Sequence, residues 1–185
     1  MTNIIFLLDR SGSMKICEDD AIGGYNSFLD IQKQEHSEAY ITTILFDNHY
    51  EILHDHVDIQ EVKHITRKEY FARGTTALLD AIGTTITKFS GINAIMIIIT
   101  DGLDNASKKF QIKSIYEMID EKQKQNWEFI FLGANIDAVK TAGSIGINSE
   151  RAANFPIEDL RNKFEGLARS VTSFRTSGIV SEEWK

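Results

Sequence analysis

Oxygen-bearing side chains follow two strongly apolar stretches of the sequence and precede a helical pattern at a third place. These residues are Asp9, Ser11, Ser13, Thr76 and Asp101. Asp9 directly follows the apolar stretch 4–8, and Asp101 directly follows the stretch 95–100. A carboxylate at the end of a buried strand is partly desolvated, and no sequence pattern places a lysine or arginine between these two. The all-oxygen set therefore predicts a site for a hard cation: Mg²⁺, with Mn²⁺ or Ca²⁺ as alternatives.

Each of these residues also has an ordinary structural role available. The two serines could cap the next helix, Asp101 and its following glycine could form only a turn, and Thr76 could cap its own helix. The alternation of Asp9, Ser11 and Ser13 lets one loop direct three oxygens the same way. Ligands of open α/β sheets bind at the carboxyl ends of the strands, so three such loops together favour a shared ligand.

The elements that would position this site are apolar, β-branched stretches of strand length. Four of them predict buried strands: Asn3–Leu8, Tyr40–Phe46, Asn93–Thr100 and Trp127–Leu132. Their uniformly apolar character is typical of a parallel sheet covered on both faces. A fifth strand, Tyr50–Val57, follows Asp47 and Asn48 closely enough to be an antiparallel hairpin partner at the edge.

Apolar residues at helical spacing lie between and after the strands. They predict helices around residues 22–31, 78–89 and 112–119, and a C-terminal helix over 157–176. Gly23 and Gly24 weaken the first of these helices by roughly 1 kcal/mol each relative to alanine. The terminal pattern also resembles a short heptad seam, but packing against the sheet is favoured over a dimerising coil. Alternating strands and helices predict one doubly wound α/β domain over residues 1–185.

Composition restricts the kind of partner and the compartment. The formal net charge is -7 and the sequence pI is about 5.2, which disfavours a nucleic acid partner. Cys17 is the only cysteine, so no intrachain disulfide can form. The apolar stretch 4–8 is too short for a signal peptide or a membrane span. We therefore expect a cytoplasmic protein, provided that Met1 is the native start.

Three segments of the chain resemble the motifs of one family. Asp9-Arg10-Ser11-Gly12-Ser13 resembles the DxSxS motif of von Willebrand factor type A (vWA) domains. The segment 74–82 resembles their glycine-x-threonine segment, and residues 100–102 resemble their third motif. The order and spacing match over about residues 3 to 150. Many members of the family are extracellular modules of larger chains, whereas this chain shows no secretion signal, so it looks more like the small, stand-alone bacterial or phage versions. The resemblance implies a Rossmann-like, mostly parallel sheet with one antiparallel edge strand, helices on both faces and a metal-ion-dependent adhesion site (MIDAS).

In this family the five matching residues bind the metal directly or through water. The resemblance carries these roles to Asp9, Ser11, Ser13, Thr76 and Asp101, with Thr75 as the nearest rival to Thr76. Neutral hydroxyls leave much of the ion's charge uncancelled, so that it can accept a carboxylate from a partner protein. The chain is thus predicted to be a protein-binding module rather than an enzyme, without membrane contact and with its oligomeric state open. Arg10 and Arg73 could add hydrogen bonds to the partner's carboxylate or could have only a surface role.

The main alternative is a Mg²⁺-dependent phosphotransfer or phosphatase reaction on Asp9. Phosphatases of the haloacid dehalogenase type require a second aspartate two residues later, where this chain has Ser11. No glycine-rich nucleotide motif follows a strand, and Gly133-Ala134-Asn135 predicts only a strand-to-helix turn.

Five other residues could suggest a site. His54 and His56 are predicted to share one face of a solvated edge strand, where two imidazoles could begin a metal site. Cys17 is expected to be buried or at a helix edge. Asp104 and Asn105 are expected to form an exposed turn, with a second ion or a partner contact as the alternative.

Overall fold

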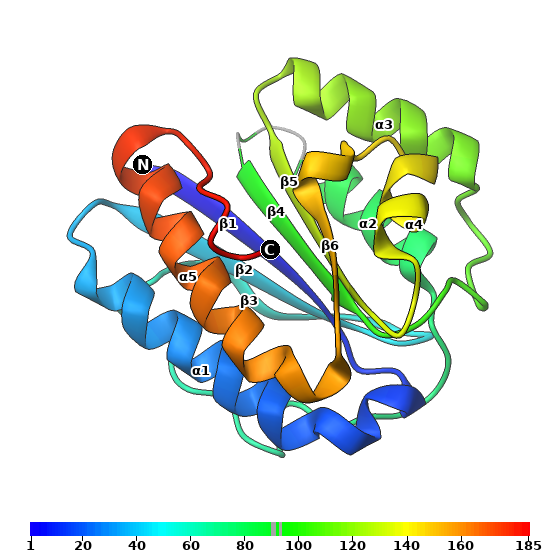
Figure 1. Cartoon of the computed structure of the whole chain (residues 1–185), viewed down its shortest axis with the longest axis horizontal. Coiled ribbons are helices and arrows are strands. Elements are labelled where there is room, and N and C mark those ends of the chain that lie inside the picture. Colours follow the sequence, from blue (N-terminus) through cyan, green and yellow to red (C-terminus); the bar gives the residue numbers. More distant parts are fainter. Residues whose placement is uncertain (90–91, 93) are drawn as a thin grey trace.

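The computed structural model describes residues 1–89, 92 and 94–185. Within these residues, the centre of the fold is a six-stranded sheet with the order β3-β2-β1-β4-β5-β6 (Figure 1). The strands are β1 (Thr2–Asp9), β2 (Ala39–Phe46), β3 (Tyr50–Asp58), β4 (Ala94–Thr100), β5 (Glu128–Ala134) and β6 (Ala152–Phe155). All neighbouring pairs are parallel except β2 and β3. Asn93, predicted as the first residue of β4, lies outside the described residues.

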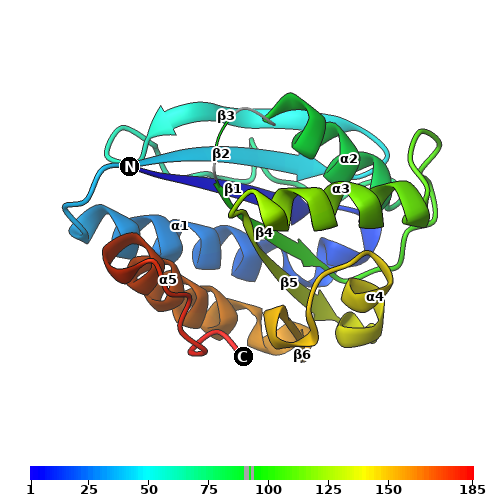
Figure 2. The same ribbon diagram turned by 90° about the horizontal axis from the view of Figure 1, so that it is seen from above.

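Helices cover both faces of the sheet (Figure 2). One face carries α1 (Glu18–Gln34) and α5 (Leu160–Ser177), and the other carries α2 (Leu78–Lys88), α3 (Ile112–Lys124) and α4 (Ala138–Ser144). Short 3₁₀ turns occupy Gly12–Cys17, Ser149–Arg151 and Ile157–Asp159, so the region predicted as a C-terminal helix consists of a 3₁₀ turn followed by α5. The predicted fold class is confirmed: a Rossmann-like, mostly parallel sheet with one antiparallel edge strand and helices on both faces.

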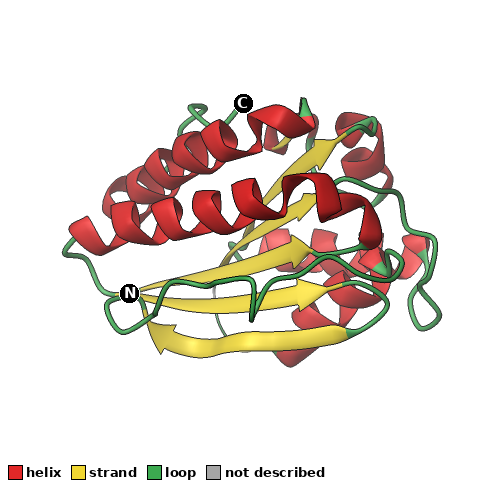
Figure 3. Ribbon diagram, turned by 90° about the horizontal axis from the view of Figure 1, so that it is seen from below, coloured by secondary structure: helices red, strands yellow, loops and turns green. Residues whose placement is uncertain are grey.

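The central strand β1 shows why residues 4–8 are all apolar. Ile4, Phe6 and Leu8 belong to the core beneath α1 and α5, whereas Ile5 and Leu7 belong to the core beneath α2, α3 and α4. Both alternating sets are buried, so none of the positions 4–8 favours a polar side chain. In β1 the next polar residue, Asp9, therefore comes at the carboxyl end of the strand, and Figure 3 shows that the parallel strands end at the same edge of the sheet.

The edge strand β3 does not have the regular alternation of side chains that the sequence predicted. Its pairing with β2 has register shifts around Thr43, and His56 has a φ of 52°. The prediction that His54 and His56 share one face is wrong, because this bulge breaks the period of two. His54 Nδ1 lies 3.3 Å from Tyr25 Oη beneath α1, whereas His56 Nε2 lies 2.9 Å from Asn3 Oδ1. The two imidazoles therefore do not form a common metal site.

No helix in the part of the chain that the structure describes combines the length and the apolar character needed to cross a lipid bilayer.

The adjacent glycines of α1 lead to the first testable prediction. A Cβ atom at Gly24 would overlap the ring of Phe164 on α5, whereas a Cβ at Gly23 would lie 3.8 Å from Arg161 Cζ. We expect Gly24→Ala to lower the free energy of unfolding by about 1–3 kcal/mol through overpacking, despite the better helix propensity of alanine. Gly23→Ala should instead raise it by up to about 1 kcal/mol. Urea unfolding followed by circular dichroism measures both, and equal effects at the two positions would contradict this packing.

Candidate functional site

The first part of the candidate site lies where β1 and β4 end side by side. Leu8 pairs with Ile99, so Asp9 and Thr100 emerge next to each other. The Thr100 hydroxyl donates a hydrogen bond of 2.6 Å to Asp9 Oδ2, and the backbone N–H of Ser11 donates one of 2.6 Å to Asp9 Oδ1. Both oxygens of this fully buried carboxylate are thus held in place.

The next loops bring the other predicted residues to the same place. Ser13 Oγ donates a 2.7 Å hydrogen bond to Asp101 Oδ1, and the hydroxyl oxygens of Ser11 and Ser13 lie 3.2 Å apart. Asp9, Ser11, Ser13 and Asp101 are therefore joined in one hydrogen-bonded group, although they come from two loops separated by about half of the chain. We call these four residues together with Thr76 the MIDAS-like cluster.

Thr76 joins this cluster by packing. A Cβ at Gly102 would lie 3.2 Å from Thr76 Oγ1, so the threonine hydroxyl lies against the glycine that follows Asp101. Thr76 is buried, whereas Thr75 is exposed and its backbone N–H points to Asn48 Oδ1 at 3.4 Å. The burial of Thr76 and the exposure of Thr75 favour Thr76 as the threonine that contributes a hydroxyl oxygen to the cluster.

Backbone hydrogen bonds fasten the loop before Thr76 to the loop after β1. The N–H of Gly12 donates to the carbonyl of Gly74 at 3.1 Å, and the N–H of Arg73 donates to the carbonyl of Arg10 at 2.8 Å. Gly74 has a φ of 67°, in the left-handed region that a glycine adopts without strain. The buried Tyr70 hydroxyl donates to the carbonyl of Asp9 at 2.7 Å. The loop before Thr76 is thus held directly against the loop after β1, which brings Thr76 to the other residues of the cluster.

The electrostatics of the cluster are those of two carboxyl groups without a counter-charge. Burial raises the pKa of Asp9 to about 6, although hydrogen bonds from Thr100 and Ser11 act in the opposite direction. Burial also raises the pKa of Asp101. Among the described residues, no lysine, arginine or histidine side chain forms an ion pair with either carboxylate. A cation would stabilise this arrangement, and the donor set of carboxylate and hydroxyl oxygens fits a hard divalent ion.

Arg10 is not available to a ligand, in contrast to the role considered from the sequence. It is buried, and its guanidinium donates to Asp47 Oδ2 at 3.0 Å and to Glu51 Oε2 at 2.7 Å. Arg73 donates to the same Asp47 oxygen at 2.8 Å but is partly exposed. The ring of Phe71 lies under both guanidinium groups. These residues hold the β2–β3 turn against the loops of the cluster.

Asp104 and Asn105 have a structural role that the sequence did not predict. Asn105 Oδ1 accepts the N–H of Thr76 at 2.9 Å, and Asp104 Oδ1 accepts the N–H of Leu79 at 3.2 Å. They satisfy donors at the start of α2, as polar residues at a helix N-terminus do, but from a loop about 25 residues away. Cys17 also has a structural role: it is buried, and its thiol donates a hydrogen bond of 3.3 Å to the carbonyl of Met14.

The loop after β5 is a strand-to-helix connection. Gly133 and Ala134 still belong to β5, and Asn135 has a φ of 56° before the cap of α4. Asp137 accepts the N–H of Lys140 at 3.0 Å. The predicted turn is therefore present, but it begins at Asn135, two residues after Gly133.

Comparison with known proteins gives relatives by structure only. No family model matches the sequence, and no curated protein sequence matches it. The vWF domain of the type V pilus tip protein Mfa5 from Porphyromonas gingivalis superposes with a TM-score of 0.74 at 9% identity, covering 98% of each chain. A vWA protein from Catenulispora acidiphila gives 0.68 at 13% identity, covering 93% of this chain and 43% of its own.

A third similar structure has a metal at the corresponding type of site. Proximal thread matrix protein 1 from the mussel byssus, with zinc in its MIDAS motif, gives a TM-score of 0.66 at 15% identity. The match covers 92% of this chain and 46% of the mussel protein, so the chain spans less than half of that protein and of the Catenulispora one. The resemblance suggested by the three sequence motifs is confirmed in the fold: this chain has the architecture of von Willebrand factor type A domains.

Proposed function

We propose that residues 1–185 form a vWA domain that binds a protein partner through a divalent metal ion. The ion is Mg²⁺, with Mn²⁺ or Ca²⁺ as alternatives, and its ligands are the five residues of the MIDAS-like cluster. When bound, the ion supplies a positive charge that can accept one further anionic oxygen. The observation that carries the proposal is the convergence of two buried carboxylates and three hydroxyls, with which no basic side chain of the described residues is paired.

The donor set supports a hard cation. Of the five donors, two are carboxylates and three are neutral hydroxyls, so the charge of a divalent ion is not exceeded and the ion remains attractive to an external carboxylate. The described residues contain no group of three or more histidine, cysteine, aspartate or glutamate side chains arranged to hold a metal. A soft-metal site therefore has no support here, although the related mussel protein carries zinc in its MIDAS motif.

The surroundings of the cluster support a protein as the partner. Two segments that supply cluster residues also expose a large apolar side chain: Ile16, in the segment after β1, is 75% exposed, and Leu103, in the loop after β4, is 58% exposed. Apolar side chains beside a charged centre are typical of protein interfaces, where they contribute contact area while the charged group gives specificity.

Asp9 is poorly suited to nucleophilic chemistry, which supports a binding role over phosphotransfer. The carboxylate is fully buried and both of its oxygens already accept hydrogen bonds. The residue two positions later is a serine whose backbone N–H holds Asp9, so the second acidic residue that phosphatases of the haloacid dehalogenase type require at that position is missing. The cytoplasmic location stays a prediction from the sequence.

The proposal is tested by selecting random peptides displayed on phage against the immobilised protein in Mg²⁺ and eluting with EDTA. We expect the eluted peptides to share an aspartate or glutamate, because the ion accepts a carboxylate. Replacing that residue by its amide should remove binding, whereas amidating another position should not. Peptides that bind equally well in EDTA, or that contain no common acidic residue, would show that the chain does not recognise partners in this way.

A further inference from the structure

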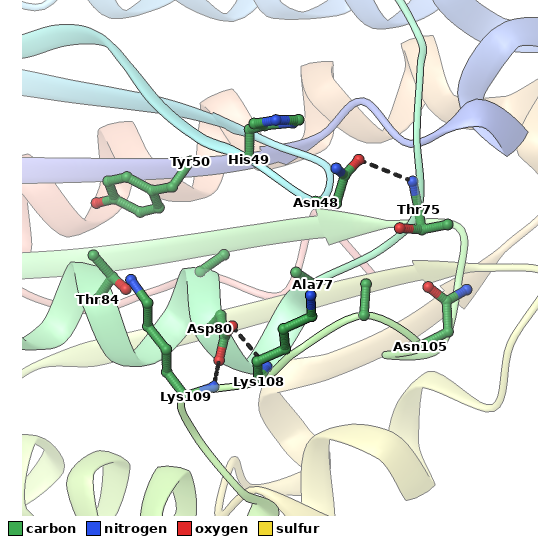
Figure 4. A pocket seen from close by; sticks show the side chains of 12 residues that line it. Asn48, His49, Tyr50, Thr75, Ala77, Asp80, Thr84, Asn105, Lys108 and Lys109 are labelled. Carbon is green, nitrogen blue, oxygen red and sulfur yellow. Dashed lines mark hydrogen bonds between the residues drawn. The ribbon is translucent and has the colours of Figure 1, made fainter.

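A polar pocket of about 510 Å³ lies beside the MIDAS-like cluster (Figure 4). The β2–β3 turn forms one wall with Asn48 and His49, and α2 forms another with Asp80 and Thr84. The loop after β4 closes the pocket with its own polar residues: Asn105, Lys108 and Lys109. We call it the lysine pocket.

The lysine pocket and the MIDAS-like cluster share a wall. Thr75 lines the pocket and precedes Thr76, whose N–H donates to Asn105 Oδ1 at 2.9 Å. The carbonyl of Thr76 in turn accepts the N–H of Asn105 at 2.9 Å and that of Ala106 at 3.1 Å. A polypeptide that reaches the cluster therefore meets the pocket within a few residues.

The two lysines of the pocket are fixed by their backbones and free at their side chains. Asp80 accepts the backbone N–H groups of Lys108 and Lys109, both at 2.8 Å, and that of Phe110 at 2.9 Å. Within the described residues, neither ammonium group forms a salt bridge or a side-chain hydrogen bond. Figure 4 shows Lys109 extending toward Thr84 and Lys108 extending toward Ala77.

The charge of the pocket contrasts with that of the whole chain. The protein has a net charge of -7, yet this pocket presents two exposed lysines next to the place where an external carboxylate is proposed to bind. Among the lining residues Asp80 is the one carboxylate; its three backbone donors lower its pKa against the effect of burial, so it stays ionised, and the two lysines still leave the lining with an excess of one positive charge. An acidic partner is repelled by most of this surface, so a local basic pocket is where a second acidic group gains most.

Resting on the function proposed above, we propose that the lysine pocket binds a second acidic side chain of the same partner protein. The partner segment thus carries two carboxylates a few residues apart: one completes the metal site, and the other lies between Lys108 and Lys109. The metal gives the first contact its orientation, and the lysines select among the many proteins that expose a single carboxylate.

The test uses the metal-dependent phage peptides, synthesised with a fluorescent label, and the double variant Lys108→Gln/Lys109→Gln. The variant keeps the backbone hydrogen bonds to Asp80, so its fold should be unchanged. Selected peptides should contain a second acidic residue, and the variant should bind them about fivefold more weakly. Removing the second acidic residue from the peptide should cause the same loss, and combining both changes should cause little more.

A matched control removes two charges elsewhere. Lys63→Gln/Lys113→Gln alters exposed lysines outside the pocket and should bind the peptides within about twofold of the wild type, since distant exposed charges are screened. EDTA-sensitive binding that is equally strong for both double variants would overturn the lysine pocket alone. Peptide binding that ignores EDTA would overturn the metal-dependent function, and the present inference with it.

Discussion

Titration calorimetry with Mn²⁺ should detect one dominant site in the wild-type protein and none in the Asp9→Asn or Asp101→Asn variants. Each substitution removes one of the two charges of the MIDAS-like cluster, and neutral oxygens alone hold a divalent ion weakly. We expect an affinity loss of at least about 100-fold, because charged oxygen ligands dominate binding of hard ions. Asp9→Asn keeps an oxygen that can accept the Ser11 N–H or the Thr100 hydroxyl, so that loss of the ion is separated from loss of the fold.

The control for this experiment is an acidic residue outside the cluster. Glu117 is exposed on α3, and Glu117→Gln changes the net charge by the same amount without touching the site. It should titrate like the wild type. The Asp9→Ala variant should also lose the site, and its circular dichroism spectrum should show that the fold is retained. Equal Mn²⁺ binding by the wild type and by Asp9→Asn would remove these five residues as the metal ligands.

The parts of the fold that the sequence predicts well are those in which local pattern and tertiary environment agree. Residues 4–8 of β1 and 94–99 of β4 are all apolar because both faces of these strands are covered, and this pattern can be recognised without knowing which elements pack against them. The candidate site follows from the same strands, since polar residues at the ends of adjacent parallel strands meet at one edge. Asp9, Ser11 and Ser13 lie within five residues of one another, so this part of the site could be predicted from the sequence alone.

Elements defined by distant contacts were not predicted. β6 has only four residues, and its pairing with β5 rather than its composition makes it a strand. α4 has seven residues, too few for a helical pattern to stand out, and Asn154 of β6 accepts the N–H of Ala138 at 2.7 Å at its start. The bulge at His56 depends on the register between β2 and β3, and the alternation of side chains along one strand carries no information about that register.

The burial of Arg10 is the clearest case of a role set by long-range contacts. Its partners Asp47 and Glu51 lie 37 and 41 residues away in the sequence, at the β2–β3 turn and in β3. Its position between Asp9 and Ser11 suggested either a contact to the partner's carboxylate or a role at the surface, and neither is compatible with its burial. The carboxylate of Asp47 instead draws the guanidinium into the protein, where the Phe71 ring also lies against it.

Asp47→Ala should be among the most destabilising single substitutions in this protein. Asp47 is fully buried and accepts hydrogen bonds from Arg10 Nε at 3.0 Å, from Arg73 Nε at 2.8 Å and from the backbone N–H of His49 at 2.6 Å. Its removal leaves the buried Arg10 charge with Glu51 alone, and breaking a buried pair from one side costs about 3–5 kcal/mol. Urea unfolding of the variant measures this loss as a lower transition midpoint.

Two comparisons and a pH series make the Asp47 experiment specific. Glu51 contacts the same guanidinium at 2.7 Å but its side chain is 48% exposed, so Glu51→Ala should cost no more than about 1 kcal/mol. Arg10→Met combined with Asp47→Ala should be more stable than Asp47→Ala alone, because no unpaired buried charge remains.

Burial disfavours the Asp47 carboxylate, but hydrogen bonds from Arg73 and His49 outweigh this effect and lower the pKa of Asp47. A lowered pKa in the folded state means that Asp47 contributes its stability above the unfolded value of about 4 and loses it as the pH falls further. The difference in unfolding free energy between wild type and Asp47→Ala should therefore shrink below about pH 4. A loss no larger than that of Glu51→Ala, or one that is independent of pH in this range, would show that Asp47 does not hold the β2–β3 turn to the loops of the site.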